Sequence, residues 1–116
     1  MSSFTIYHNP RCSKSRQTLA LLNERGIEPN IIEYLKSPLS MDDLQVLRQR
    51  LAVPALAMIR SREPAFEDLE LRKVQHDDDA LLQAIAEQPS LLERPVVVCG
   101  NKAVIGRPPE NVLELL

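Results

Sequence analysis

Cys12 lies between an apolar run typical of a β-strand and a pattern typical of an α-helix. The run Phe4–Tyr7 precedes it, and the helical spacing of apolar residues begins at about Ser13. At a helix N-terminus, unpaired N–H groups and the positive end of the dipole stabilise an anion and favour a thiolate over a thiol. The sequence therefore predicts a reactive thiolate that faces a site suited to an anion.

Positive charges surround this cysteine in the sequence. Arg11, Lys14 and Arg16 raise the local potential, and His8 adds to it when protonated. A cysteine without partners is often a small buried hydrophobic residue with no chemistry. Because Cys12 has polar and charged neighbours and lies on no apolar face, we favour a reactive thiol over an inert one.

The spacing of apolar residues predicts the elements that position this thiol. We expect strands at 4–7, 31–35, 96–99 and 102–105, and helices at about 13–25, 41–50, 55–59, 80–87 and 110–116. The order β-α-β, then helices, then β-β-α is the thioredoxin arrangement. We therefore expect a single thioredoxin-like α/β domain over 1–116. It has a mixed four-stranded sheet, flanking helices and a helical insertion at about 40–90 before the C-terminal β-hairpin.

Two expectations concern packing outside the sheet. The segment 61–76 is mixed and polar, and we expect Phe66 and Leu69 to pack inward from it. The final helix is expected to bury Val112, Leu113 and Leu116.

Further residues bear on the chemistry of Cys12. In a thioredoxin-like fold the residue before the hairpin strand is often a cis-proline beside the cysteine; Pro95 holds that position, and we expect it to be cis. Three residues after Cys12 comes Ser15, whose hydroxyl can donate to a thiolate or an oxyanion. The site is therefore monothiol. We interpret Cys99, in an apolar strand, as a packed core cysteine.

A longer motif identifies a family resemblance. The run Tyr7-His8-Asn9-Pro10-x-Cys12-Ser13-x-Ser15-Arg16 resembles the active-site signature of the glutaredoxin-coupled arsenate reductases. The resemblance extends over nearly the whole chain and includes the segments 26–29, 57–60, 92–98 and 106–108.

The resemblance implies a mechanism. The cysteine matching Cys12 attacks arsenate, glutathione forms a mixed disulfide with it, and glutaredoxin restores the thiol with release of arsenite. The arginines matching Arg60, Arg94 and Arg107 bind the oxyanion, for which a planar, permanently charged fork is well suited. Taken singly, each arginine is also typical of an ordinary surface charge.

Two more roles follow from the same resemblance. The residue matching His8 helps to depress the cysteine pKa, and the residue matching Ser15 forms a hydrogen bond near the sulfur. For His8, the capping of a turn is an equally good interpretation of the residues alone.

Composition narrows the class of protein. The 116 residues carry a net charge of −2 with no dominant basic face, so we expect no nucleic acid partner. We see no signal peptide and no run long enough to span a membrane. We also see no metal-ligand pattern and expect no bound cofactor, because glutathione would act as a co-substrate. Cytoplasm, where thiols stay reduced, is the expected location, and a monomer the expected state.

Two other functions remain open from the sequence. Relatives of this fold act as redox-responsive regulators that bind RNA polymerase, although those with sensing chemistry typically carry Cys-x-x-Cys, which Ser15 interrupts here. A glutathione-dependent thiol reductase with a non-arsenate substrate would need Cys12 but not all three arginines.

Overall fold

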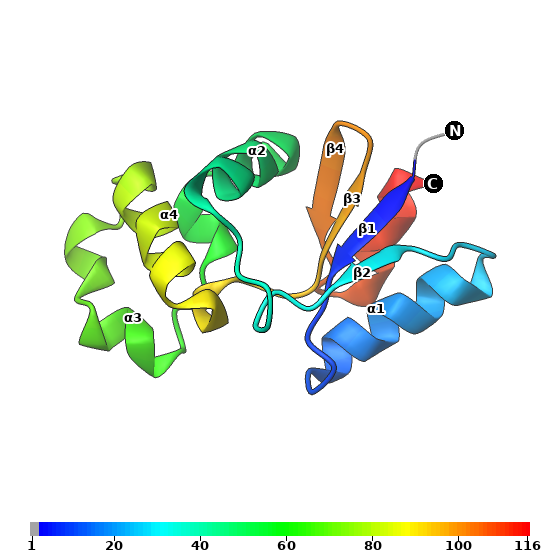
Figure 1. Ribbon diagram of the computed structural model, residues 1–116, viewed down its shortest axis with the longest axis horizontal. Coiled ribbons are helices and arrows are strands. Elements are labelled where there is room, and N and C mark those ends of the chain that lie inside the picture. Colours follow the sequence, from blue (N-terminus) through cyan, green and yellow to red (C-terminus); the bar gives the residue numbers. More distant parts are fainter. Residues whose placement is uncertain (1–2) are drawn as a thin grey trace. The chain divides into compact units, whose positions relative to one another are not determined.

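The computed structural model describes residues 3–116, which divide into two compact units (Figure 1). The first contains the chain up to Ser37 and from Arg94 onward, and the second spans Pro38–Glu93. The expectation that the whole chain forms one domain stays a prediction.

The first unit is built on a sheet of strands β1 (Phe4–Tyr7), β2 (Asn30–Ile32), β3 (Val96–Cys99) and β4 (Lys102–Ile105). The order is β2-β1-β3-β4, with β1 parallel to β2 and the other two pairs antiparallel. The predicted mixed four-stranded α/β architecture is therefore confirmed. The parallel pair is joined through a helix, as parallel strands require.

Strand β2 is shorter than the 31–35 expected from the sequence. The chain leaves the sheet because the Glu33 carbonyl accepts the N–H groups of Lys36 (2.9 Å) and Ser37 (3.0 Å), which closes a turn. Tyr34 is consequently removed from the strand, yet its side chain is fully buried. Periodicity alone does not detect this turn, since the residues that form it are strand-like.

Helix α1 (Ser13–Glu24) and the C-terminal 3-10 helix η4 (Pro109–Leu115) contact each other, on one side of the strands in Figure 1. The core between helices and sheet is formed by Ile6, Leu22, Val97 and Val112, all fully buried. Burial of such side chains contributes about 1.5–3 kcal/mol each.

The last helix differs from its prediction. It is a 3-10 helix rather than an α-helix, and its tighter winding changes which residues face the core. Val112 is buried as expected, but Leu116 is 55% exposed, and Leu115 packs against the core instead.

The second unit consists of helices, with α4 (Asp78–Glu87) in contact with α2 (Met41–Leu51) and with the 3-10 helices η1 (Ala55–Met58), η2 (Leu71–Val74) and η3 (Pro89–Leu91). Ser40 caps α2 through a reciprocal capping box with Asp43. Asp77 caps α4 by accepting the Ala80 N–H at 3.1 Å.

The segment 61–76 is more regular than predicted, since it contains α3 (Pro64–Asp68) as well as η2. Phe66 is buried, as expected, but Leu69 is 42% exposed and Leu71 is 4% exposed. The prediction for Leu69 was wrong because Glu70 adopts a left-handed conformation (φ 53°) that redirects the chain between the two helical turns.

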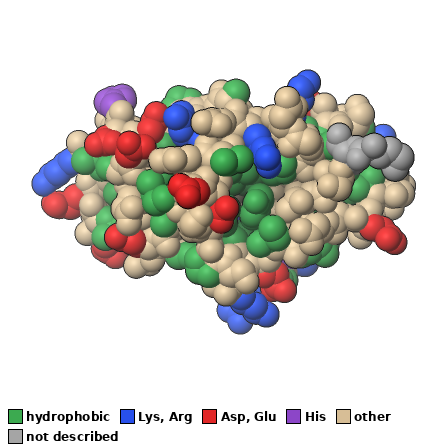
Figure 2. Space-filling model, turned by 45° about the horizontal axis from the view of Figure 1, so that its top comes forward, with side chains coloured by type: hydrophobic (Ala, Val, Ile, Leu, Met, Phe, Trp, Pro, Cys, Tyr) green, Lys and Arg blue, Asp and Glu red, His purple; other side chains and the backbone are tan. Residues whose placement is uncertain are grey.

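On the face drawn in Figure 2, acidic and basic side chains are interspersed, in keeping with the small net charge. Within residues 3–116, no helix is long and apolar enough to cross a membrane.

A matched pair of substitutions tests the packing of α3 and η2. Leu71→Ala is expected to lower the free energy of unfolding by about 2–5 kcal/mol, because it opens a cavity in the core. Leu69→Ala should cost less than about 1 kcal/mol, because nearly half of that side chain is in water. Urea denaturation measures both values. Equal losses, or a larger loss at Leu69, would contradict this packing.

Candidate active site

Cys12 is the N-cap residue of α1, directly after the loop that follows β1. Its N–H donates to the Asn9 carbonyl at 3.0 Å, and its carbonyl accepts the Arg16 N–H at 3.0 Å as the first bond of the helix. The half-buried thiol therefore lies at the N-terminus of a 12-residue helix, where the sequence predicts it.

Opposing effects act on the pKa of Cys12. Burial of the thiol raises its pKa, but the Ser15 backbone N–H, the Arg94 guanidinium and the Lys14 backbone N–H together lower it further than burial raises it. The pKa of Cys12 is consequently below its ordinary value. A thiolate is the nucleophilic form of cysteine, so these groups activate the sulfur.

Arg94 and Arg107 reach the sulfur because of the hairpin register. Val96 at the start of β3 pairs with Ile105 at the end of β4, so the residues just outside the hairpin meet at one end of the sheet. That end also holds the close of β1, because Tyr7 pairs with Val96. Two arginines distant in sequence are thereby brought to the loop that carries Cys12.

The two guanidinium groups contact the sulfur and its surroundings. Arg107 Nη1 lies 3.9 Å from Cys12 Sγ and donates to the Arg94 carbonyl at 3.2 Å. Burial lowers the pKa of Arg94, but its interactions with Cys12 and Tyr34 raise the pKa by more than burial lowers it. The cationic form of Arg94 is therefore favoured. Each arginine precedes a cis-proline, Pro95 (predicted to be cis from the sequence) and Pro108.

Gly106 permits the hairpin to approach α1 closely. A Cβ atom at this position would lie 2.7 Å from Thr18 Oγ1 and 2.9 Å from Pro95 Cγ, which is too close for any side chain. The Gly106 N–H donates to the Pro95 carbonyl at 2.8 Å. Thr18 in turn is held by its hydroxyl, which donates to the Lys14 carbonyl at 2.8 Å.

His8 and Ser15 form a buried pair, with exposed fractions of 6% and 0%. Ser15 Oγ accepts the Asn9 N–H at 3.0 Å, and it lies 2.6 Å from His8 Nδ1. The tautomer of the imidazole decides which of these two groups donates the hydrogen bond. Burial lowers the pKa of His8, Glu33 opposes this effect and Arg16 adds to it, so that the pKa lies below its ordinary value.

This pair differs from expectation in two respects. Near neutral pH the depressed pKa leaves His8 uncharged, so it adds no positive charge beside Cys12. Ser15 acts on the sulfur through its backbone N–H, while its hydroxyl bonds to His8. The catalytic roles of both residues stay predictions.

Arg60 belongs to the second unit. Its guanidinium forms ion pairs with Glu63 and with Glu93, the latter at 3.8 Å. The first unit thus brings together Cys12, Ser15, Arg94 and Arg107, whereas a role for Arg60 in binding an oxyanion stays a prediction.

Cys99 is half-buried at the end of β3, not packed in the core, because it is the last residue before the hairpin turn. It pairs with Phe4, at the start of β1, while the loop to Cys12 leaves from Tyr7 at the other end of that strand. The two thiols therefore lie at opposite ends of the sheet.

Sequence reasoning missed Tyr34, whose buried side chain raises the pKa of Arg94. A tyrosine in a strand-like run is typical of core packing, and no local signal distinguishes one that supports an arginine. In the part of the chain that the structure describes, no three His, Cys, Asp or Glu side chains converge as a metal site would require.

Comparison with known proteins gives matches over nearly the full length. Residues 7–115 match the model of the ArsC family. YfgD, an uncharacterized protein of Escherichia coli strain K12, is 46% identical over 112 residues, which cover 96% of this chain and 94% of YfgD. An arsenate reductase of Haemophilus influenzae is 45% identical over 115 residues, which cover 98% of this chain and 99% of the relative.

A solved structure of an arsenate reductase from Vibrio cholerae is similar in both sequence and fold. It is 51% identical and superposes with a TM-score of 0.95, covering 99% of this chain and 98% of its own.

The effect of Arg94 on the thiol is open to direct measurement. Arg94→Gln is expected to raise the pKa of Cys12, because it removes a donor and a positive charge while burial continues to oppose the thiolate. The midpoint of the rate of iodoacetamide alkylation against pH should therefore move to higher pH. Arg25→Gln, at the far end of α1, is the control. An unchanged midpoint in Arg94→Gln would refute the assignment.

The close approach at Gly106 predicts a stability effect. Gly106→Ala should lower the free energy of unfolding by about 1–3 kcal/mol, because the new methyl group collides with Thr18 and Pro95. Thr18→Ala removes one of the two clashing neighbours, so the double variant should lose less than the sum of the single losses. Denaturant titration of the three variants measures this, and simple additivity would argue against the steric explanation.

Proposed function

Because this chain belongs to the ArsC family, we propose that it reduces arsenate to arsenite in the cytoplasm, with Cys12 as nucleophile and with glutathione and glutaredoxin as reductants. The observation that carries the proposal is the placement of Cys12 Sγ at a helix N-terminus beside the guanidinium groups of Arg94 and Arg107. This arrangement suits a thiolate that attacks a tetrahedral oxyanion.

The first step uses the two arginines and the thiolate together. Arsenate accepts hydrogen bonds from Arg94 and Arg107, which bring the anion to the sulfur and offset the repulsion between two negative charges. Cys12 attacks arsenic, an S–As bond forms, and one arsenate oxygen leaves as water after taking up protons. Arsenic remains As(V) in this adduct.

The second step transfers two electrons. The sulfur of glutathione attacks Cys12 Sγ, an S–S bond forms and the S–As bond breaks with its electron pair on arsenic. Arsenic leaves as As(III) in arsenite, which retains the proton from the glutathione thiol. Glutaredoxin then attacks the mixed disulfide, takes the glutathionyl group and returns Cys12 to the thiol.

Two features of the chain support an external thiol as the reductant. Ser15 stands where a resolving cysteine would lie in Cys-x-x-Cys, and Cys99 lies at the other end of the sheet. We therefore assign the second thiol to glutathione. In this scheme His8 and Ser15 hold the loop 8–11 in place, and Arg60 is the third oxyanion ligand.

The proposal is tested by following NADPH oxidation in the presence of arsenate, glutathione, glutaredoxin and glutathione reductase. Turnover by the natural sequence should fall to background in Cys12→Ser, because the nucleophile is lost. Cys99→Ser is the matched control and should retain turnover.

Two results would contradict the assignment. Arsenate turnover that survives in Cys12→Ser would remove the proposed nucleophile. A natural protein that exchanges thiols through Cys12 but leaves arsenate unreduced would instead be a thiol reductase with another substrate.

A further inference from the structure

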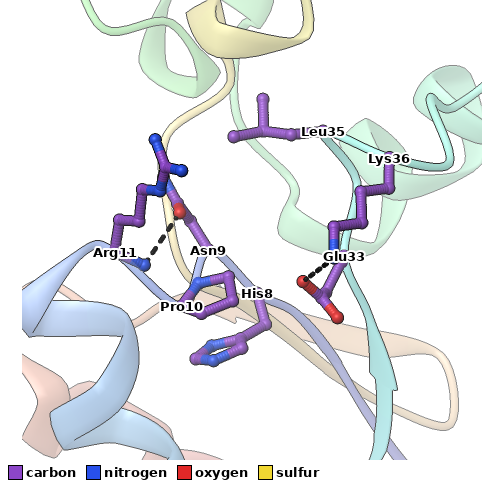
Figure 3. Close-up of a pocket in the computed structure, with 7 residues that line it drawn as sticks. All are labelled: His8, Asn9, Pro10, Arg11, Glu33, Leu35 and Lys36. Atoms are coloured by element: carbon purple, nitrogen blue, oxygen red, sulfur yellow. Dashed lines mark hydrogen bonds and ion pairs between the residues drawn. The ribbon is translucent and has the colours of Figure 1, made fainter.

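A cavity of about 350 Å³ adjoins the loop that carries Cys12. One wall is the loop 8–11, and the other is formed by Glu33, Leu35 and Lys36, which follow β2 (Figure 3). Its volume lies at the lower end of the range of about 300–1,000 Å³ typical of small-molecule sites. The mechanism described above assigns no function to this cavity.

The residues that line the cavity include neighbours of Cys12. Arg11, which lines it, is the residue before Cys12, and Asn9, which also lines it, accepts the Cys12 N–H at 3.0 Å. The Asn9 side chain stabilises the same loop by accepting the Arg11 N–H at 3.0 Å. The loop that lines this cavity therefore also holds Cys12.

The charges that line the cavity are of both signs. Arg11 stands on one side, and the ion pair of Glu33 with Lys36 (3.5 Å) stands on the other (Figure 3). Leu35, which is 45% exposed, and Pro10 supply apolar surface between them. An exposed pair such as Glu33–Lys36 contributes little to stability, so both groups can be redirected to a ligand at small cost.

We propose that this cavity binds glutathione, the co-substrate of the function proposed above, on which this inference rests. The γ-glutamyl end of that tripeptide carries an ammonium and a carboxylate on one carbon. Glu33 accepts hydrogen bonds from the ammonium, and Lys36 and Arg11 donate to the carboxylate. The methylene groups of the ligand pack on Leu35 and Pro10.

The size and charge of the ligand agree with this assignment. A tripeptide extends over about 10 Å, with its thiol in the middle, so one end can occupy the cavity while the sulfur reaches Cys12. The Glu33 carboxylate disfavours a purely anionic ligand such as a second arsenate. A zwitterion is the charge type that satisfies both walls.

The test uses a reaction that needs no arsenate. The Cys12 thiolate attacks oxidised glutathione, the S–S bond of the disulfide breaks, one glutathione thiolate leaves, and a mixed disulfide forms on Cys12. Mass spectrometry follows its rate. Bis(2-hydroxyethyl) disulfide, which has no charge, serves as the control reagent.

Glu33→Gln and Lys36→Gln should each slow the reaction with oxidised glutathione by about fivefold, the upper end for an exposed charge pair. Their reaction with the uncharged disulfide should not change. Glu28→Gln, an exposed carboxylate in the same unit, is the matched control and should react with both reagents like the natural protein. Because Glu33 raises the pKa of His8, its removal leaves His8 neutral as before.

Each outcome separates this inference from the proposed function. Equal slowing with both disulfides, or no slowing with oxidised glutathione, would overturn the assignment of the cavity. Selective slowing in a natural protein that fails to reduce arsenate would support the glutathione site and refute arsenate reduction.

Discussion

The site depends on one balance of opposing effects at Cys12. Partial burial disfavours the charged thiolate, whereas the backbone N–H groups of Ser15 and Lys14 and the Arg94 guanidinium favour it, and these groups prevail. Two of these three groups are backbone N–H groups in the first turn of α1. They act on the sulfur because Cys12 is the N-cap residue of that helix. The third comes from a residue 82 positions away in the sequence, at the start of the hairpin. Local and long-range structure therefore act on the same atom.

The hairpin places its two arginines beside the sulfur through its strand register and its close packing on α1. The pairing of Val96 with Ile105 brings Arg94 and Arg107 to the same end of the sheet, and Gly106 allows that end to approach α1. The approach places a cationic pair beside the sulfur of Cys12, whereas Cys99 lies at the other end of the sheet. Such a site suits a tetrahedral oxyanion and a single activated thiol, and the proposed function assigns the second thiol to glutathione.

Sequence periodicity predicted the four strands and α1 well, because their apolar residues follow periods that few other structures share. It failed where the backbone departs from a regular period, as at the turn after Glu33 and at the left-handed Glu70. For the site, the position of Cys12 followed from its place before a helix. The neutral state of His8 and the effect of Tyr34 on Arg94 could not be predicted from the sequence, since both depend on burial that only the folded chain creates.

The central claim is that the pKa of Cys12 lies below that of an ordinary cysteine, and an ultraviolet titration of the thiolate tests it most directly. The difference in absorbance between the natural protein and Cys12→Ser, followed against pH, isolates this group from Cys99. The account predicts a midpoint below the ordinary value for a cysteine thiol. A midpoint at or above that value would mean that burial prevails over the N–H groups and Arg94, and it would contradict the account.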